Sequence, residues 1–256
     1  MLRTVIATRY VTPLREGGSL PAVVEADDDG MYVLKFRGAG QGPKVLIAEL
    51  VTGELARAAG LPVPEIVFIQ LDADLARTEP DAEIQALIRA SPGLNIALDF
   101  LPGAVMFDPV VEKPEAILAS SIVWFDAYVS NVDRTARNAN LLVWHHQLQL
   151  IDHGAALYFH HSWDGAAESG RVDRSRDAFT RIKDHVLLRY ATQLREVDTI
   201  LSGRLTPQVI RDIVGMIPGT WLGGETGDAY LEYLTRRLTS PREFVEEAIR
   251  AHAKLV

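Results

Sequence analysis

Two polar turns near the middle of the chain carry the side chains best suited to chemistry. Asp133 and Asn138 stand five residues apart in the first turn, and Asp152 lies in the second. The strand-like runs 141–144 and 148–151 between them predict a hairpin that brings both turns to one end. Phosphoryl transfer needs such a set, in which one carboxylate orients an attacking hydroxyl and an oxygen pair holds magnesium against phosphates.

Each of these features has a simpler interpretation when it is taken alone. Asp and Asn are common turn-forming residues, so a lone Asp-x-x-x-x-Asn is weak evidence for catalysis. The hairpin spacing and the aliphatic-Asp-x-Gly turn at 151–154 make the pattern more specific. Its weight then depends on a lysine and a glutamate in suitable places upstream.

A lysine stands near the end of an apolar strand in the N-terminal part. The run 31–36 alternates in side-chain direction, which places Tyr32, Leu34 and Phe36 on one face and Lys35 on the other. A lysine in this position is usually an edge or solvent residue. The functional alternative is that it points into a cleft.

A glutamate follows in the helix predicted over residues 44–59, which ends at the cap residue Gly60. Helix glutamates are most often solvated, and Glu54 competes with Glu49 for a functional role. If Glu49 pairs with Lys35, the ion pair aims the lysine at nucleotide phosphates.

The order of predicted elements indicates the fold class. Strands with one main helix come first, a break follows at Pro102-Gly103, and the remainder is mostly helical apart from the hairpin. This segregation predicts an α+β, two-lobed architecture with residues 1–101 in the N-terminal lobe and 102–256 in the C-terminal lobe. Near the C-terminus, Ser240-Pro241-Arg242-Glu243 predicts a helix capped by Ser240.

Composition limits the class of protein. The 256 residues are 48% hydrophobic and 23% charged, as in an ordinary soluble protein, and contain no long apolar run that would span a membrane. The absence of cysteine excludes disulfides and thiolate metal sites and suits a cytoplasmic protein. The net charge of -8 argues against direct nucleic-acid binding. It could attract a basic substrate, although acidic excess mostly maintains solubility.

Taken in order, the motifs resemble those of the HipA-like kinases, a branch of the protein-kinase-like fold related to the phosphatidylinositol kinases. The resemblance covers roughly residues 15–160, and the ordered set is more specific than any single motif. Its motifs are Tyr32-Val33-Leu34-Lys35, Glu49 ahead of Gly60-Leu61-Pro62-Val63-Pro64, Asn131-Val132-Asp133-Arg134 through Asn138, and Ile151-Asp152-His153-Gly154.

The resemblance implies a role for each matching residue. Lys35 would contact the ATP phosphates with support from Glu49, and Asp133 would be the catalytic base. Asn138 and Asp152 would hold magnesium. The hinge against adenine would be Asp99-Phe100-Leu101, and the phosphate loop would fall at Gly17-Gly18-Ser19. The glycine-rich run 38–42 is an alternative phosphate loop, but it follows the lysine strand, which is the wrong order.

Departures from the family pattern affect the expected partners. The chain is too short for the additional N-terminal subdomain of long HipA toxins, which argues against pairing with a DNA-binding antitoxin. Position 153 is His where protein kinases have Phe.

Several functions are therefore open. The first is an ATP- and magnesium-dependent kinase acting on Ser or Thr of a protein. The alternatives are a lipid or small-molecule kinase and a regulatory pseudokinase, although pseudokinases usually lack one of the polar residues present here. A metal hydrolase is disfavoured because adjacent histidines on a strand or turn point apart. The histidines concerned are His145, His146, His153, His160 and His161, expected at the surface, with His153 able to bind a phosphate.

Overall fold

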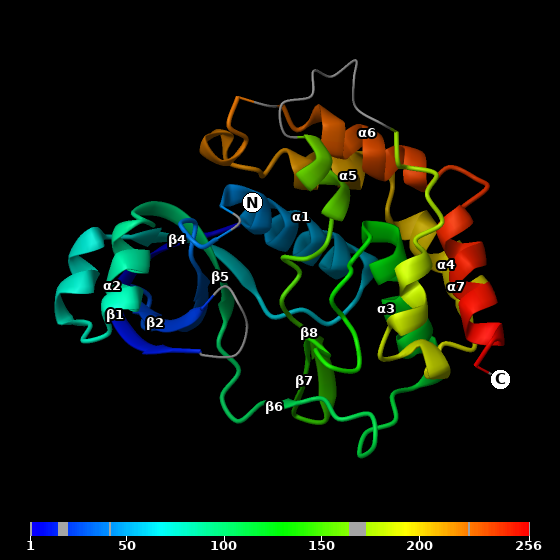
Figure 1. Ribbon diagram of the computed structural model, residues 1–256, viewed down its shortest axis with the longest axis horizontal. Coiled ribbons are helices and arrows are strands. Elements are labelled where there is room, and N and C mark those ends of the chain that lie inside the picture. Colours follow the sequence, from blue (N-terminus) through cyan, green and yellow to red (C-terminus); the bar gives the residue numbers. More distant parts are fainter. Residues whose placement is uncertain (1, 15–19, 41, 164–172, 225, 256) are drawn as a thin grey trace.

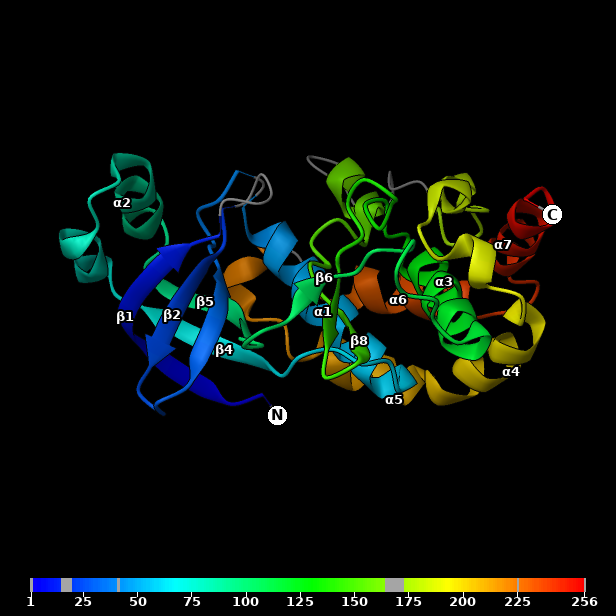
Figure 2. The ribbon, with the colours of Figure 1, turned by 90° about the horizontal axis from the view of Figure 1, so that it is seen from below.

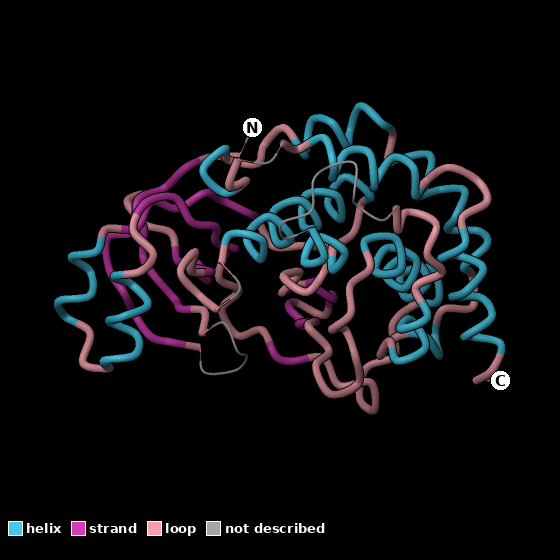
Figure 3. The backbone as a smooth tube through the Cα atoms, turned by 45° about the horizontal axis from the view of Figure 1, so that its top comes forward, coloured by secondary structure: helices cyan, strands magenta, loops and turns pink. Residues whose placement is uncertain are grey.

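A computed structural model describes residues 2–14, 20–40, 42–163, 173–224 and 226–255. Strands gather at the N-terminal end of the molecule and helices at the C-terminal end, which confirms the α+β class (Figures 1 and 3). A view from below shows the same division, with the strands curving around one another beside the helical part (Figure 2). None of the described helices is both long and apolar enough to cross a membrane.

The N-terminal strands close into a barrel in the order β1-β2-β3-β5-β4. The first and last strands of this order, β1 and β4, pair in parallel, whereas all other neighbours are antiparallel. The strands are β1 (Thr4–Pro13), β2 (Ala22–Ala26), β3 (Met31–Lys35), β4 (Ile66–Leu71) and β5 (Gly93–Asp99).

Alternation along the strands fills two separate hydrophobic cores. In β4, Val67 and Ile69 lie inside the barrel, where Tyr32 and Leu34 of β3 also pack. The alternating residues Ile66 and Phe68 pack in a larger core outside the barrel. The barrel is closed at one end by α2 (Ala82–Arg89), which packs beside the short helix η1 (Ala73–Thr78).

Helix α1 (Pro43–Ala59) joins the barrel to the C-terminal helices through the larger core (Figure 1). The helix ends at Gly60, whose φ of 85° is a left-handed conformation that favours glycine. Its buried side chains contact β4 and β5 on one side and α4, α5 and η6 on the other. One face of α1 therefore points toward the end of the barrel at which β3 ends.

The C-terminal part is built around α3, in which Trp124 and Tyr128 are fully buried against Phe244 of α7. A small sheet lies in front of α3, in the order β6-β7-β8. The helices are α3 (Ala116–Val129), α4 (Leu194–Arg204), α5 (Pro207–Val214), α6 (Asp228–Arg237) and α7 (Glu243–Ala253), with shorter turns η2 (Tyr158–Trp163), η4 (Thr180–Asp184), η5 (Leu188–Tyr190) and η6 (Gly219–Trp221). The strands are β6 (Val105–Met106), β7 (Leu141–Trp144) and β8 (Gln147–Leu150).

The predicted cap at Ser240 is wrong. Helix α7 begins at Glu243 after Arg242, and no side chain caps its first turn. The guanidinium of Arg242 instead donates to Asp198 on α4, with Nε–Oδ1 at 2.7 Å and Nη2–Oδ2 at 2.5 Å. This tertiary ion pair sets where α7 starts.

A buried arginine on α6 provides a test of this packing. We expect Arg237→Gln to lower the free energy of unfolding by about 3 kcal/mol, because a fully desolvated guanidinium and its acceptors lose their partners. Arg237 donates to the carbonyls of Ala127 (2.9 Å), Tyr128 (2.8 Å), Ser175 (3.1 Å) and Asp177 (2.8 Å). Urea denaturation followed by circular dichroism measures the loss.

The neighbouring Arg236 is a matched control, because it is exposed and forms only surface ion pairs with Asp173 and Glu232. We expect Arg236→Gln to change the stability by less than about 1 kcal/mol. Similar losses for the two variants would contradict the structural role assigned to Arg237.

Candidate active site

Lys35 is held in the interior by the register of its strand. It pairs with Ile96 of β5, whose side chain belongs to the core around α1, so Lys35 lies on the α1 side of the sheet. The side chain is 7% exposed. Its Nζ lies 2.7 Å from Oδ1 of Asp152 and 3.9 Å from Oε2 of Glu49. Residues from β3, α1 and the turn after β8 thus meet at one ammonium group.

The charges of this cluster stabilise one another. Burial lowers the pKa of the Lys35 ammonium, but the two neighbouring carboxylates outweigh burial and the pKa is raised overall. Burial likewise raises the pKa of Asp152, and the Lys35 charge and hydrogen bond reverse the shift, so that the pKa is lowered. Lysine and aspartate are therefore both charged at neutral pH.

Glu49, not Glu54, is the glutamate that faces Lys35. Glu49 is fully buried, whereas Glu54 lies 3.4 Å from Arg57 one turn further along the helix. Oε1 of Glu49 is 3.5 Å from Nδ1 of His153, which is also fully buried. The expectation that His153 is a surface residue is wrong, because its ring packs toward α1.

Gly154 allows α1 to pass close to the turn that contains Asp152. A Cβ atom at this position would lie 2.7 Å from Cγ1 of Val45 and 3.8 Å from Oε2 of Glu49. A larger residue would push the turn away from α1 and separate Lys35 from its partners. The glycine of the aliphatic-Asp-x-Gly turn therefore has a packing requirement.

The loop that holds Asp133 starts where α3 ends. Ser130 takes a left-handed conformation with φ of 55° and turns the chain out of the helix. Oδ2 of Asp133 accepts hydrogen bonds from Nδ2 of Asn138 at 2.7 Å and of Asn140 at 3.4 Å. Oδ1 accepts none from the described residues, so this oxygen is available to a substrate hydroxyl.

The two polar turns meet as the hairpin predicts. Leu141 pairs with Leu150, and the chain reverses at His145 and His146. At the other end of the hairpin, Ile151 donates its N–H to the carbonyl of Asn140 at 3.1 Å. The loop with Asp133 and the turn with Asp152 are thus joined by a backbone hydrogen bond.

The oxygen atoms of this region suit a divalent cation. Nδ2 of Asn138 donates to Asp133, and Oδ1 of Asp152 accepts from Lys35, so that Oδ1 of Asn138 and Oδ2 of Asp152 have no partner among the described residues. Amide and carboxylate oxygens are hard ligands of the type magnesium prefers, with phosphates and water completing its coordination. Asn138 and Asp152 therefore fit a metal held together with phosphates.

The buried carboxylate of Asp126 on α3 holds the loop that contains Asp133 in place. Oδ2 of Asp126 accepts from Nε of Arg134 at 2.6 Å and from Nε2 of His185 at 2.8 Å, and Oδ1 accepts from Nδ2 of Asn131 at 3.0 Å. Asn131 in turn accepts the N–H of Asp133 at 3.1 Å. Three side chains around one carboxylate thus hold the backbone on both sides of Asp133.

The protonation of this network follows from its contacts. Burial lowers the pKa of His185, and its Nδ1 accepts the N–H of Leu187 at 3.0 Å, so a neutral ring donates Nε2–H to Asp126. Burial opposes ionisation of Asp126, but the charge of Arg134 and the hydrogen bonds lower its pKa to about 2. An ionised carboxylate is therefore stable inside the core.

Sequence analysis did not identify Asp126 or His185 as parts of the site. One signal was present, because Asp126 stands four residues after Ile122 on the apolar stripe of a helix. A charged residue on a buried helix face must be paired. His185 carries no such signal, since its approach depends on the path of the chain after η4.

The predicted hinge lies at the end of β5, and part of its backbone is already engaged. The N–H of Asp99 donates to the carbonyl of Glu65 at 2.8 Å, and that of Phe100 donates to Met31 at 2.9 Å. Among the described residues the N–H of Leu101 finds no acceptor, so it is free to donate to a ligand. The predicted phosphate-loop residues Gly18 and Ser19 lie outside the described residues.

The histidines do not form a metal centre. Within the described ranges no group of three or more His, Cys, Asp or Glu side chains is placed to hold a metal ion. His145 and His146 are exposed at the hairpin turn, whereas His160 is buried beside Tyr230. The surface location expected for His160 is therefore also wrong.

The Asp126 network predicts a specific dependence of stability on pH. We expect Asp126→Asn to lower the free energy of unfolding by about 3–5 kcal/mol near pH 7, because Arg134 loses the charge that offsets its burial. Asp126 has a lowered pKa in the folded protein, so its contribution is present above the usual pKa of about 4. This contribution disappears as the pH falls toward about 2, which is the pKa of Asp126 in the folded protein.

Denaturant unfolding of both proteins between pH 7 and pH 2 measures this dependence. The difference between the wild type and the variant should narrow from about pH 4 downward. Asp184→Asn, a change at an exposed position, is the control and should leave the curve unaltered. A difference that stays constant with pH would show that Asp126 does not contribute as a charge.

Comparisons with known proteins identify the family and the fold. The family of HipA-like kinases matches residues 8–232. No curated protein is similar enough to be matched to the sequence. The fold is similar to that of the Helicobacter pylori proinflammatory kinase CtkA, with a TM-score of 0.58 and 13% identity over 98% of this chain and 99% of that one. It is also similar to the Golgi casein kinase in its crystal structure with Mn/ADP bound, with a TM-score of 0.53 and 12% identity over 98% and 74%. The barrel followed by helices is thus a kinase-like fold, and the chain belongs to the HipA-like kinases, which makes it a phosphotransferase.

Proposed function

We propose that this kinase transfers the γ-phosphate of ATP, in the presence of magnesium, to a serine or threonine hydroxyl of a protein. The observation that carries the proposal is the convergence of Lys35, Glu49 and Asp152 next to a loop whose Asp133 keeps a free carboxylate oxygen. A buried ammonium between two carboxylates costs desolvation energy and gains little stability by itself. Its position at the end of a barrel strand suits a phosphate ligand.

In this proposal residues 1–101 and 102–256 form two lobes with the nucleotide between them. The free N–H of Leu101 would contact the adenine, and the Lys35 ammonium would move from Asp152 to the phosphates while Glu49 keeps it inside the site. Glu49 is suited to this task because it is fully buried and cannot follow the lysine outward. The supporting features are the separate barrel core and the position of Lys35 on its α1 side.

Asn138 and Asp152 would hold the magnesium ion, which neutralises phosphate charge when bound. Both residues have an oxygen free of hydrogen bonds to the described residues. A structural neighbour, the Golgi casein kinase, has been solved with Mn/ADP. That complex supports the use of a nucleotide with a divalent metal.

Asp133 would act as the general base. Its Oδ2 is fixed by Asn138 and Asn140, and Oδ1 is free to accept the proton of the acceptor hydroxyl. The hydroxyl oxygen attacks the γ-phosphorus, the bond from that phosphorus to the β–γ bridging oxygen breaks, and ADP leaves. The proton passes to Asp133. The Asp126 network supports this step because it holds Asp133 in place before the acceptor arrives.

Two carboxamide substitutions separate the proposed base from the proposed metal ligand. Asp133→Asn keeps size and turn preference but removes the proton acceptor, so phosphate transfer should fall by roughly 10²–10⁴. Affinity for ATP with magnesium should remain near that of the wild type. Asp152→Asn should weaken this affinity as well as transfer, because it removes the negative charge that attracts the metal and pairs with Lys35.

Calorimetric titration with ATP and magnesium gives the affinities, and transfer from labelled ATP to protein acceptors gives the rates. Asp108→Asn, a change in the loop after β6, is a control that should affect neither measurement. Wild-type transfer by Asp133→Asn would show that Asp133 only forms a turn.

A further inference from the structure

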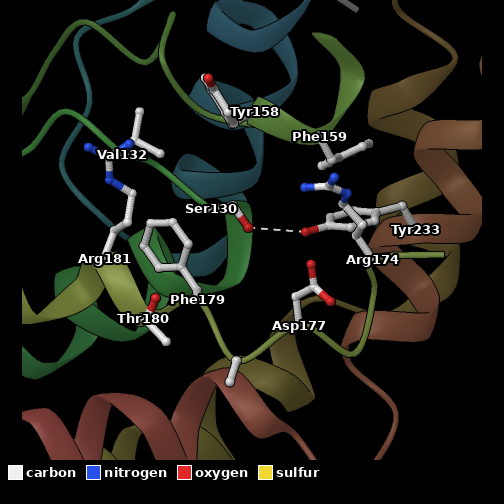
Figure 4. A pocket seen from close by; sticks show the side chains of 11 residues that line it. Ser130, Val132, Tyr158, Phe159, Arg174, Asp177, Phe179, Thr180, Arg181 and Tyr233 are labelled. Carbon is white, nitrogen blue, oxygen red and sulfur yellow. Dashed lines mark hydrogen bonds between the residues drawn. The ribbon is translucent and has the colours of Figure 1, made fainter. Parts of the chain in front are cut away.

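A hollow lies beside the loop that holds Asp133 (Figure 4). It has a volume of about 370 Å³ and is bounded by the end of α3, by η2, by residues 174–181 and by α6. Ser130 and Val132 contribute to its lining, and Val132 directly precedes Asp133 in the chain. A polypeptide whose hydroxyl reaches Asp133 would therefore place its neighbouring residues at this hollow, which we call the acceptor pocket.

Two arginines line the acceptor pocket without partners. Arg174 and Arg181 are exposed, and neither guanidinium makes a hydrogen bond or an ion pair with any described residue. Several other arginines of this part are engaged, as in the pair of Arg236 with Asp173 and of Arg242 with Asp198. The guanidinium groups of Arg174 and Arg181 are thus available to a ligand in the pocket.

The charge of the pocket opposes that of the protein as a whole. The chain has a net charge of -8, yet the described lining contains Arg174, Arg181 and a single acidic residue, Asp177. In Figure 4 Arg181 lies beside Val132, and Arg174 lies on the opposite side near Tyr233. Two cations on opposite walls can each meet a carboxylate of a ligand that lies between them.

The wall of the pocket is rigid enough to position these groups. The ring of Tyr233 stacks on Phe159 with centroids 3.5 Å apart, and its hydroxyl is 3.0 Å from that of Ser130. The buried Arg237 holds the carbonyls of Ser175 and Asp177, so the segment after Arg174 is fixed to α6. The pocket is therefore built by the core of the protein.

We propose that the acceptor pocket binds the residues flanking the phosphorylated hydroxyl and that Arg174 and Arg181 select an acidic protein segment. The proposal rests on the proposed function, because it assigns a role relative to Asp133. The overall acidity of the chain favours basic ligands at long range, whereas the pocket favours carboxylates in contact. Contact pairs form well within the Debye length of about 8 Å, whereas the attraction by the net charge acts over longer distances and is screened by salt.

Three serine peptides that differ only in their flanking residues test this selection. The flanks are glutamate, glutamine or lysine, and each peptide is measured for transfer at saturating ATP and magnesium and for binding by fluorescence anisotropy. The wild type should bind the glutamate peptide best. In the double variant Arg174→Glu and Arg181→Glu, the KM for this peptide should rise about tenfold or more, since each exposed ion pair contributes up to about fivefold. The lysine peptide should become the preferred one.

Nucleotide affinity should be the same in the double variant, because neither arginine lies at Lys35 or Asp152. Arg89→Glu is the matched control, with an exposed arginine at the end of α2 in the barrel part. It should leave all three peptide affinities unchanged. Single Arg174→Gln and Arg181→Gln variants should each weaken binding of the glutamate peptide without reversing the preference.

The outcomes distinguish this inference from the proposed function. If the wild type binds ATP with magnesium but shows no preference among the peptides, or if the double variant keeps the preference for glutamate, the inference is wrong and the kinase proposal stands. Phosphate transfer to phosphoinositide vesicles and to none of the peptides would overturn the protein acceptor. A wild type that binds no nucleotide would refute both proposals.

Discussion

The ammonium of Lys35 is the group on which the architecture of the site depends. It is buried where β3, α1 and the turn after β8 meet, and a buried charge is tolerated only when opposite charges lie close to it. Asp152 provides the direct contact and Glu49 the second negative charge. Residues 35, 49 and 152 are far apart in the sequence, so the position of one charge constrains three elements at once.

The same arrangement leaves the site incomplete without a ligand. Two carboxylates around one lysine carry an excess negative charge, and the oxygens of the buried Glu49 receive no hydrogen bond from the described residues. Such unsatisfied groups persist where function requires them. A phosphate drawn to Lys35 and a cation drawn to Asp152 would each satisfy one part of the cluster.

A second buried charge, on Asp126, fixes the other half of the site. Asp126 is enclosed by Arg134, His185 and Asn131, and these contacts hold the loop that contains Asp133. The two clusters are joined through the hydrogen bond from Ile151 to Asn140. In the proposed function the site therefore combines a base held in one arrangement with a lysine that exchanges partners.

The sequence predicts the parts of this site that follow local rules. Alternation along β3 puts the side chains of Lys35 and Leu34 on opposite faces of the sheet, and the hairpin spacing brings Asp152 near Asn138. The closure of the barrel could not be predicted, because the parallel pairing of β1 with β4 joins residues 4–6 to 68–70 and depends on how the intervening strands curve. The Asp126 network depends on contacts across the core. The start of α7 depends in the same way on the ion pair of Arg242 with Asp198.

The central claim is that Lys35, Asn138 and Asp152 form a site for a nucleotide together with a metal. Calorimetric titration of the wild-type protein with ATP, once with magnesium and once with an excess of chelator, tests it most directly. The proposed function predicts measurable binding with magnesium and a strong loss of affinity with chelator, because two protein oxygens can hold the cation only together with phosphates. Equal affinity under the two conditions, or no binding with magnesium, would contradict the claim.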